Sequence, residues 1–164
     1  VPLLETARKD HDLLIVVIHW GNEYEESPDV YHRKVAHALI DGGADLVIAH
    51  HPHVLQAIEN YKGKVIAYSL GNFLFENTTA IPRLTGVLRV RFEGKDSCLK
   101  QAIFHPAVII RTPSKHPAPA TGGLAKTVRA RVIAQAKELG TEWTQASDSE
   151  DLVMSGLGAC ASER

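Results

Sequence analysis

Two short apolar runs, separated by one amphipathic segment, constrain the fold of this chain more than any other feature. Residues 13–18 (LLIVVI) and 46–49 (LVIA) are continuous and rich in β-branched side chains, a pattern typical of strands buried on both faces of a parallel sheet. Between them, Ser27 is placed to cap a helix whose first turn holds Pro28, and a Gly-Gly pair ends that helix. A strand, a helix and a strand in this order predict parallel strands joined by a right-handed crossover, and hence an α/β fold.

Three more strands are predicted downstream. One is expected at residues 64–70, after a turn at 60–63. Residues 86–93 alternate between apolar and charged side chains, which is typical of a strand with one solvated face. Residues 101–111 are the expected antiparallel partner of that strand.

Composition divides the chain into three parts. Residues 1–111 are expected to form one domain, and 112–123 are rich in Pro and Gly and predict a linker or surface loop. Residues 124–164 are expected to form a helix and a tail. The helix, at 124–139, is expected to carry Arg and Lys on its exposed face, and the last residues of the chain are expected to be disordered.

Histidines follow two of the predicted parallel strands. His19 follows the first strand, and His50, His51 and His53 end the second. Because the carboxyl ends of parallel strands meet at one edge of a sheet, these side chains are expected to lie together. Neutral imidazole is a common protein ligand for transition metals, so we predict a metal site formed by His19, His51 and His53. His50 is either a first ligand or a support for the others, and Pro52 is expected to restrict His51 to extended conformations.

Two further polar residues have open interpretations. Glu23 either hydrogen-bonds a ligand histidine and fixes its tautomer or is a solvated loop acid. Asn72, after the strand at 64–70, either contacts substrate or an incoming phosphate or serves a turn.

Composition excludes several classes of protein. Eighteen basic and nineteen acidic residues leave a net charge of -1, which provides no broad field for nucleic acid or an anionic membrane. The sequence holds no apolar run long enough to span a bilayer. The two cysteines, Cys98 and Cys160, have neither metal-type spacing nor the pattern of a disulfide framework and are expected to be unpaired.

The motifs HWGNE, GADLVIAHHPHVLQ and YSLGNF lie within residues 19–75, and this segment closely resembles the CapA family of capsule and poly-γ-glutamate biosynthesis, a branch of the calcineurin-like metallophosphoesterase superfamily. The resemblance implies an αββα sandwich, with two sheets face to face and helices outside. It also implies a centre of two divalent ions of manganese, iron or zinc. His19 matches the family's lone histidine, and His51 with His53 match its G-H-x-H element, with Ala49 in place of the glycine.

The same resemblance implies that acidic motifs upstream of this chain supply the bridging ligand. With them, the protein is expected to hydrolyse a phosphoester, and His19, His51 and His53 would act in catalysis by stabilising the developing charge. The chain alone is expected to bind metal weakly and turn over little.

The alternatives are a non-catalytic scaffold or polymer-binding subunit of a membrane-associated capsule synthase, and a phosphodiesterase or nuclease that acts on other substrates. The implied partners are an anionic polymer or phosphoester and other synthase subunits, with no nucleic acid. The implied location is the cell surface, with any membrane anchor outside this chain.

Overall fold

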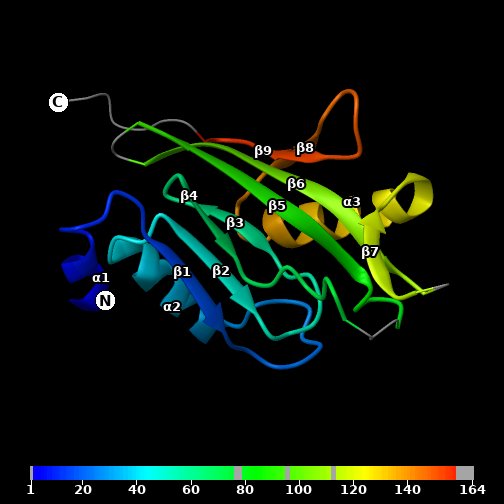
Figure 1. Cartoon of the computed structure of the whole chain (residues 1–164), viewed down its shortest axis with the longest axis horizontal. Coiled ribbons are helices and arrows are strands. Elements are labelled where there is room, and N and C mark those ends of the chain that lie inside the picture. Colours follow the sequence, from blue (N-terminus) through cyan, green and yellow to red (C-terminus); the bar gives the residue numbers. More distant parts are fainter. Residues whose placement is uncertain (1, 76–78, 95–96, 112–113, 158–164) are drawn as a thin grey trace.

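The computed structural model describes residues 2–75, 79–94, 97–111 and 114–157. It is an α/β structure of two sheets flanked by helices, consistent with part of an αββα sandwich (Figure 1). The predicted fold class is therefore confirmed.

The first sheet has four strands in the order β1-β2-β4-β3. Their bounds are Ile15–His19 (β1), Leu46–His50 (β2), Ile58–Tyr61 (β3) and Lys64–Ala67 (β4). β2 pairs in parallel with β1, as predicted, and also with β4, and β3 pairs antiparallel with β4. The turn between β3 and β4 has positive φ at Lys62 (54°) and Gly63 (77°), the conformation that matches the twist of a two-residue hairpin.

The second sheet is antiparallel and has five strands. Their bounds are Leu84–Glu93 (β5), Cys98–Ile110 (β6), His116–Pro119 (β7), Trp143–Gln145 (β8) and Leu152–Met154 (β9). The predicted pairing of β5 with β6 is confirmed. β7 pairs with β6 and lies within the stretch 112–123, which was expected to be irregular. Its prolines obscured the strand in the sequence, but a strand paired on one side tolerates the missing N–H groups.

Three helices lie within the described residues: Pro2–Ala7 (α1), Val30–Asp41 (α2) and Gly122–Lys137 (α3). The cap of α2 is Asp29, whose Oδ1 accepts a hydrogen bond from the His32 backbone N–H at 2.8 Å, so the predicted cap at Ser27 was wrong by two residues. α2 and the β5–β6 pair lie on opposite sides of the first sheet (Figure 1). None of the three helices has the length and apolar character that crossing a lipid bilayer requires.

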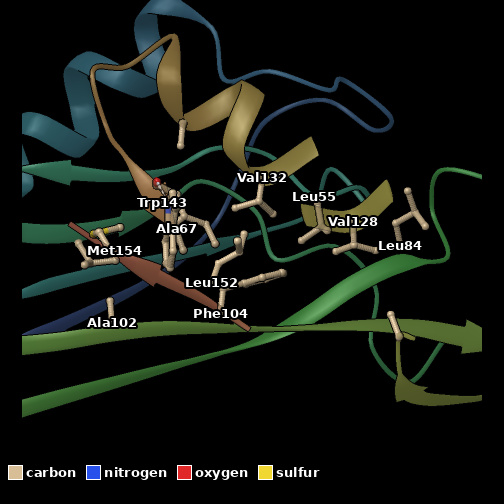
Figure 2. Close-up of a cluster of buried hydrophobic side chains, with 14 of the residues drawn as sticks. Leu55, Ala67, Leu84, Ala102, Phe104, Val128, Val132, Trp143, Leu152 and Met154 are labelled. Carbon is tan, nitrogen blue, oxygen red and sulfur yellow. Dashed lines mark hydrogen bonds between the residues drawn. The ribbon is translucent and has the colours of Figure 1, made fainter. Parts of the chain in front are cut away.

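The main core lies between the two sheets and includes one face of α3. Phe104 of β6 is fully buried there, together with Leu55, Val128 and Val132 (Figure 2). α3 therefore packs against both sheets rather than against one.

β1 is less covered than its sequence predicts. Val16 and Ile18 pack in the cluster that α2 covers, but Ile15 is 46% exposed and Val17 66% exposed. The prediction that this run is buried on both faces was wrong. The strand lies at an edge of its sheet, and an apolar run indicates which side chains favour burial without indicating whether a neighbour covers them.

The cysteine expectation was also wrong for Cys98, which is disulfide-bonded. The chain's other cysteine, Cys160, and the last residues for which disorder was expected lie outside the described residues.

Candidate functional site

Histidine side chains gather at the carboxyl end of the first sheet. His19 ends β1 and His50 ends β2, and the two residues are partners in the parallel register. The ring of His51, the next residue, lies 4.7 Å from the ring of His19, centroid to centroid. The parallel pairing of two strands thus brings together residues that are 32 positions apart in the sequence.

The turn at His51 and His53 has an unusual backbone. φ is 107° at His51 and 61° at His53, in a region that residues with a side chain rarely adopt. The prediction that Pro52 holds His51 extended was therefore wrong. Strained backbone persists only where its surroundings fix it and is concentrated at functional sites. Here, the backbone N–H of Tyr24 donates to the Pro52 carbonyl at 2.8 Å and contributes to that support.

Asn72 fixes the orientation of His53. Its Oδ1 lies 2.7 Å from His53 Nδ1, and its Nδ2 donates to the carbonyls of His53 and Pro82, both at 3.2 Å. An amide oxygen only accepts hydrogen bonds, so His53 Nδ1 is the donor. In the neutral ring, Nε2 then keeps its lone pair for a ligand. Asn72 is 5% exposed, and its contacts position a histidine, a role that differs from both of the roles predicted for it.

Glu23 lies beside His53 without a hydrogen bond to it. Its Oε1 is 4.0 Å from His53 Nε2, and its side chain is 55% exposed. That distance suits an ion pair and is too long for a hydrogen bond. The His53 tautomer is therefore set by Asn72.

The histidines form the polar side of a cavity of about 460 Å³. The polar side is lined by His19, His50, His51, His53 and Asn72. An apolar wall is formed by Phe73, Leu74, Phe75, Val87 and Leu88. The pKa of His50 is lowered below its usual value mainly by burial, and the nearby His19 lowers it further. The neutral form of His50, which is the form that binds metals, is therefore favoured.

The fit of these residues to a metal ion is partial. Two imidazoles bound to one ion at about 2.1 Å have ring centroids about 4.5–5.5 Å apart, and the His19–His51 separation of 4.7 Å lies in this range. His51 and His53 are 6.0 Å apart, which is wider. Among the described residues, no group of three or more His, Cys, Asp or Glu side chains is arranged to hold an ion. The part of the chain that the structure describes thus offers a pair of rings and an oriented third ring rather than a full ligand set.

Residues 2–77, which contain all of these histidines and Asn72, match the family of the bacterial capsule synthesis protein PGA_cap. The chain is CapA-like. It is 49% identical over 76 residues to the PGA biosynthesis protein CapA of Bacillus subtilis, and the matched segment covers 46% of the chain and 20% of that relative. It is 30% identical over 141 residues to the capsule biosynthesis protein CapA of Bacillus anthracis, covering 86% of the chain and 33% of the relative.

A probable polyglutamine synthesis accessory protein of Mycobacterium tuberculosis is 37% identical over 65 residues, which cover 40% of the chain and 17% of that protein. The CapA-like chain spans a third or less of the length of these relatives.

Residues of α3 contact the loops that follow β1 and β2 in this CapA-like chain, and the sequence did not predict these contacts. Arg131 was expected on the exposed face of its helix, but its side chain is only 13% exposed. Its partners, Glu26 and Leu55, precede it by 105 and 76 residues. Helical periodicity locates the apolar stripe and carries no signal for such distant polar contacts.

Proposed function

We propose that this chain contributes the histidine half of a divalent-metal site to a CapA-like protein of capsule or poly-γ-glutamate biosynthesis, with a metallophosphoesterase-type, metal-dependent hydrolase centre. The observation that carries the proposal is the His19–His51 ring pair, delivered by adjacent parallel strands at a ligand-compatible separation. His19 and His51 would hold one ion together, and His53 would offer Nε2 to the same ion or to a second one. Imidazole donors suit zinc and iron.

The residues of the chain would orient the ligand rings and provide an apolar wall beside them. Asn72 keeps the Nδ1 proton on His53, and partners of this kind raise metal affinity by fixing the ring. Apolar side chains line most of the rest of the cavity, and the Phe75 ring lies 4.8 Å from the ring of His53, centroid to centroid. A bound metal would supply Lewis-acid polarisation of a phosphoester and activation of water. The remaining ligands, including a bridging carboxylate, would come from outside the described residues.

A second candidate is a non-catalytic accessory subunit that binds polymer or other capsule-synthase subunits. Two observations favour it: the incomplete ligand set within the described residues, and the accessory role in the name of the mycobacterial relative. For both candidates we propose a cell-surface location. The disulfide at Cys98 supports this location, since disulfides persist mainly outside the reducing cytosol.

A metal titration tests the proposal directly. We expect isothermal calorimetry with Zn²⁺ to show binding that His19→Ala and His51→Ala each weaken by tenfold or more, because each removes one of the paired rings. His11→Ala is the matched control, since His11 lies before β1, at the opposite end of the strand from His19. Equal Zn²⁺ affinity in all four proteins would overturn the metal site.

A second measurement separates the two candidates. The full-length protein, loaded with metal, is assayed for hydrolysis of bis-p-nitrophenyl phosphate. Turnover that disappears in His51→Ala supports the hydrolase. Stoichiometric metal without turnover, together with unchanged polymer assembly in the His51→Ala strain, supports the accessory subunit.

A further inference from the structure

α3 contacts both of the loops that carry the candidate site. The Arg131 side chain points away from the solvent, and its guanidinium makes three hydrogen bonds. Nη1 donates to Glu26 Oε2 at 2.6 Å, and Nε and Nη2 donate to the Leu55 carbonyl at 3.1 and 3.0 Å. The planar fork of an arginine suits this arrangement, because it presents several donors in a fixed geometry.

Gln135 adds to the same contact from the next turn of α3. Its Nε2 donates to the Glu26 carbonyl at 2.6 Å and to the Leu55 carbonyl at 3.2 Å. Residues four positions apart lie on the same face of a helix, so Arg131 and Gln135 form one polar patch over the two loops. Leu55 itself is fully buried and belongs to the same apolar cluster as Val128 and Val132 of α3 (Figure 2).

The two loops bear the residues around the histidine cluster. Residues 20–28 follow His19 and include Glu23, and residues 51–57 include His51 and His53. Direct contacts between the loops are present among the described residues. They include the hydrogen bond from Tyr24 N–H to the Pro52 carbonyl at 2.8 Å and one from Gln56 Nε2 to the Glu25 carbonyl at 2.8 Å. The strained turn at His51 therefore depends on support from beyond its own loop.

We propose that Arg131 is a positioning residue for the histidine cluster: it ties residues 20–28 to residues 51–57 and thereby fixes the His51 and His53 rings opposite His19. The ligand part of this inference rests on the proposed metal site, and the positioning part rests on the contacts alone. Arg131 lies outside residues 2–77, the segment that matches the capsule synthesis family. α3 would thus support candidate ligands, His19, His51 and His53, that all lie within that segment.

Arg129 provides a matched control. It lies on the same helix, its side chain is also 13% exposed, and it pairs with a carboxylate, that of Glu150. Glu150 precedes β9 and belongs to neither of the two loops, 20–28 and 51–57. Removal of either arginine costs one ion pair of α3, but only removal of Arg131 releases the two loops.

The experiment compares Arg131→Ala, Arg131→Lys and Arg129→Ala with the parent chain by NMR of the histidine rings in the absence of metal, and by Zn²⁺ titration. We expect Arg131→Ala to shift or broaden the His51 and His53 ring signals and to weaken Zn²⁺ binding roughly tenfold, the scale of a lost supporting contact. Arg131→Lys should show both effects in part, because one ammonium group cannot reach Glu26 and Leu55 in the same way. Arg129→Ala should show neither.

Each result has a separate meaning. Unchanged ring signals in both Arg131 variants would overturn the inference, as would equal changes in Arg131→Ala and Arg129→Ala. Altered ring signals in Arg131→Ala, with no Zn²⁺ binding by the parent chain, would uphold the positioning role while removing the proposed metal site. If Arg131→Ala fails to fold, Arg131→Lys, which keeps the charge, carries the comparison.

Discussion

Replacement of Asp45 by asparagine should destabilise the chain by about 3 kcal/mol at pH 7, at the lower end of the range for breaking a buried ion pair. Asp45 precedes β2, and its side chain is only 4% exposed. Its carboxylate accepts hydrogen bonds from Arg8 Nη2 at 2.5 Å, Lys64 Nζ at 2.6 Å and the Leu14 backbone N–H at 2.9 Å. Asparagine keeps one acceptor oxygen, presents an NH₂ group to the other donors and removes the charge.

The magnitude follows from these contacts. A hydrogen bond to a charged group contributes about 1.5–3 kcal/mol, and asparagine loses at least one of them along with the attraction to two cations. Arg8 and Lys64 are 34% and 28% exposed, so water partly compensates them, and we therefore take the lower end. With a urea m-value of roughly 2 kcal/mol/M, the unfolding midpoint should fall by about 1.5 M.

The pH dependence gives a sharper test. Burial tends to raise the pKa of Asp45, but the hydrogen bonds from Arg8, Lys64 and Leu14 outweigh it and hold the pKa below its usual value of 3.8. A depressed pKa in the folded state stabilises the fold above the pKa of the unfolded state, and this contribution is lost as the pH falls through the folded value. The difference in stability between the parent chain and Asp45→Asn should therefore be constant near neutrality and shrink below about pH 4.

Asp41→Asn is the control, because Asp41 pairs with Lys62 on the surface and its side chain is 46% exposed. Urea titrations of the control should nearly coincide with those of the parent chain at pH 7. A gap between the parent chain and Asp45→Asn that stays the same from pH 7 to pH 3 would refute the reasoning, as would equal stability at pH 7.

Two further predictions concern packing and covalent structure. Gly86→Ala should destabilise the fold by about 1–3 kcal/mol in urea, because an added Cβ would lie 2.1 Å from Phe104 Cζ and 2.7 Å from the His105 carbonyl oxygen; an unchanged midpoint would contradict the close packing. Cys98 should not react with a thiol reagent in the native protein and should react after reduction, as mass spectrometry of the labelled peptide can show; labelling without reductant would contradict the disulfide.

The sequence predicted the parts of the fold that depend on local patterns. The runs at 13–18 and 46–49 became the parallel strands β1 and β2, and the alternation at 86–93 became β5. β3 was missed because Ile58–Tyr61 is four residues long and half polar, and its pairing depends on the turn that follows. The pairing of β7 with the second sheet was not predicted, because the prolines of β7 made its sequence resemble a loop.

For the candidate site, the sequence predicted which histidines lie close together but not which contacts fix their positions. That His19 and His51 meet follows from the register of two parallel strands. The positive φ of His51 contradicts the local preference of a residue before proline, so only tertiary contacts explain it. One such contact is the hydrogen bond from the Tyr24 N–H to the Pro52 carbonyl, and Asn72 holds the ring of His53 from 19 positions away.

The position of His19 at the end of an edge strand has a mechanical consequence. Among the described strands, β1 has a hydrogen-bonded neighbour on one side only, so a single ladder of backbone hydrogen bonds holds the strand that ends at His19. His50 belongs to β2, which is hydrogen-bonded to a strand on each side. A segment that paired with the open side of β1 would give this strand a second ladder of hydrogen bonds and so restrict the movement of the His19 ring. Sheet extension and the geometry of the cluster are thus coupled through one strand.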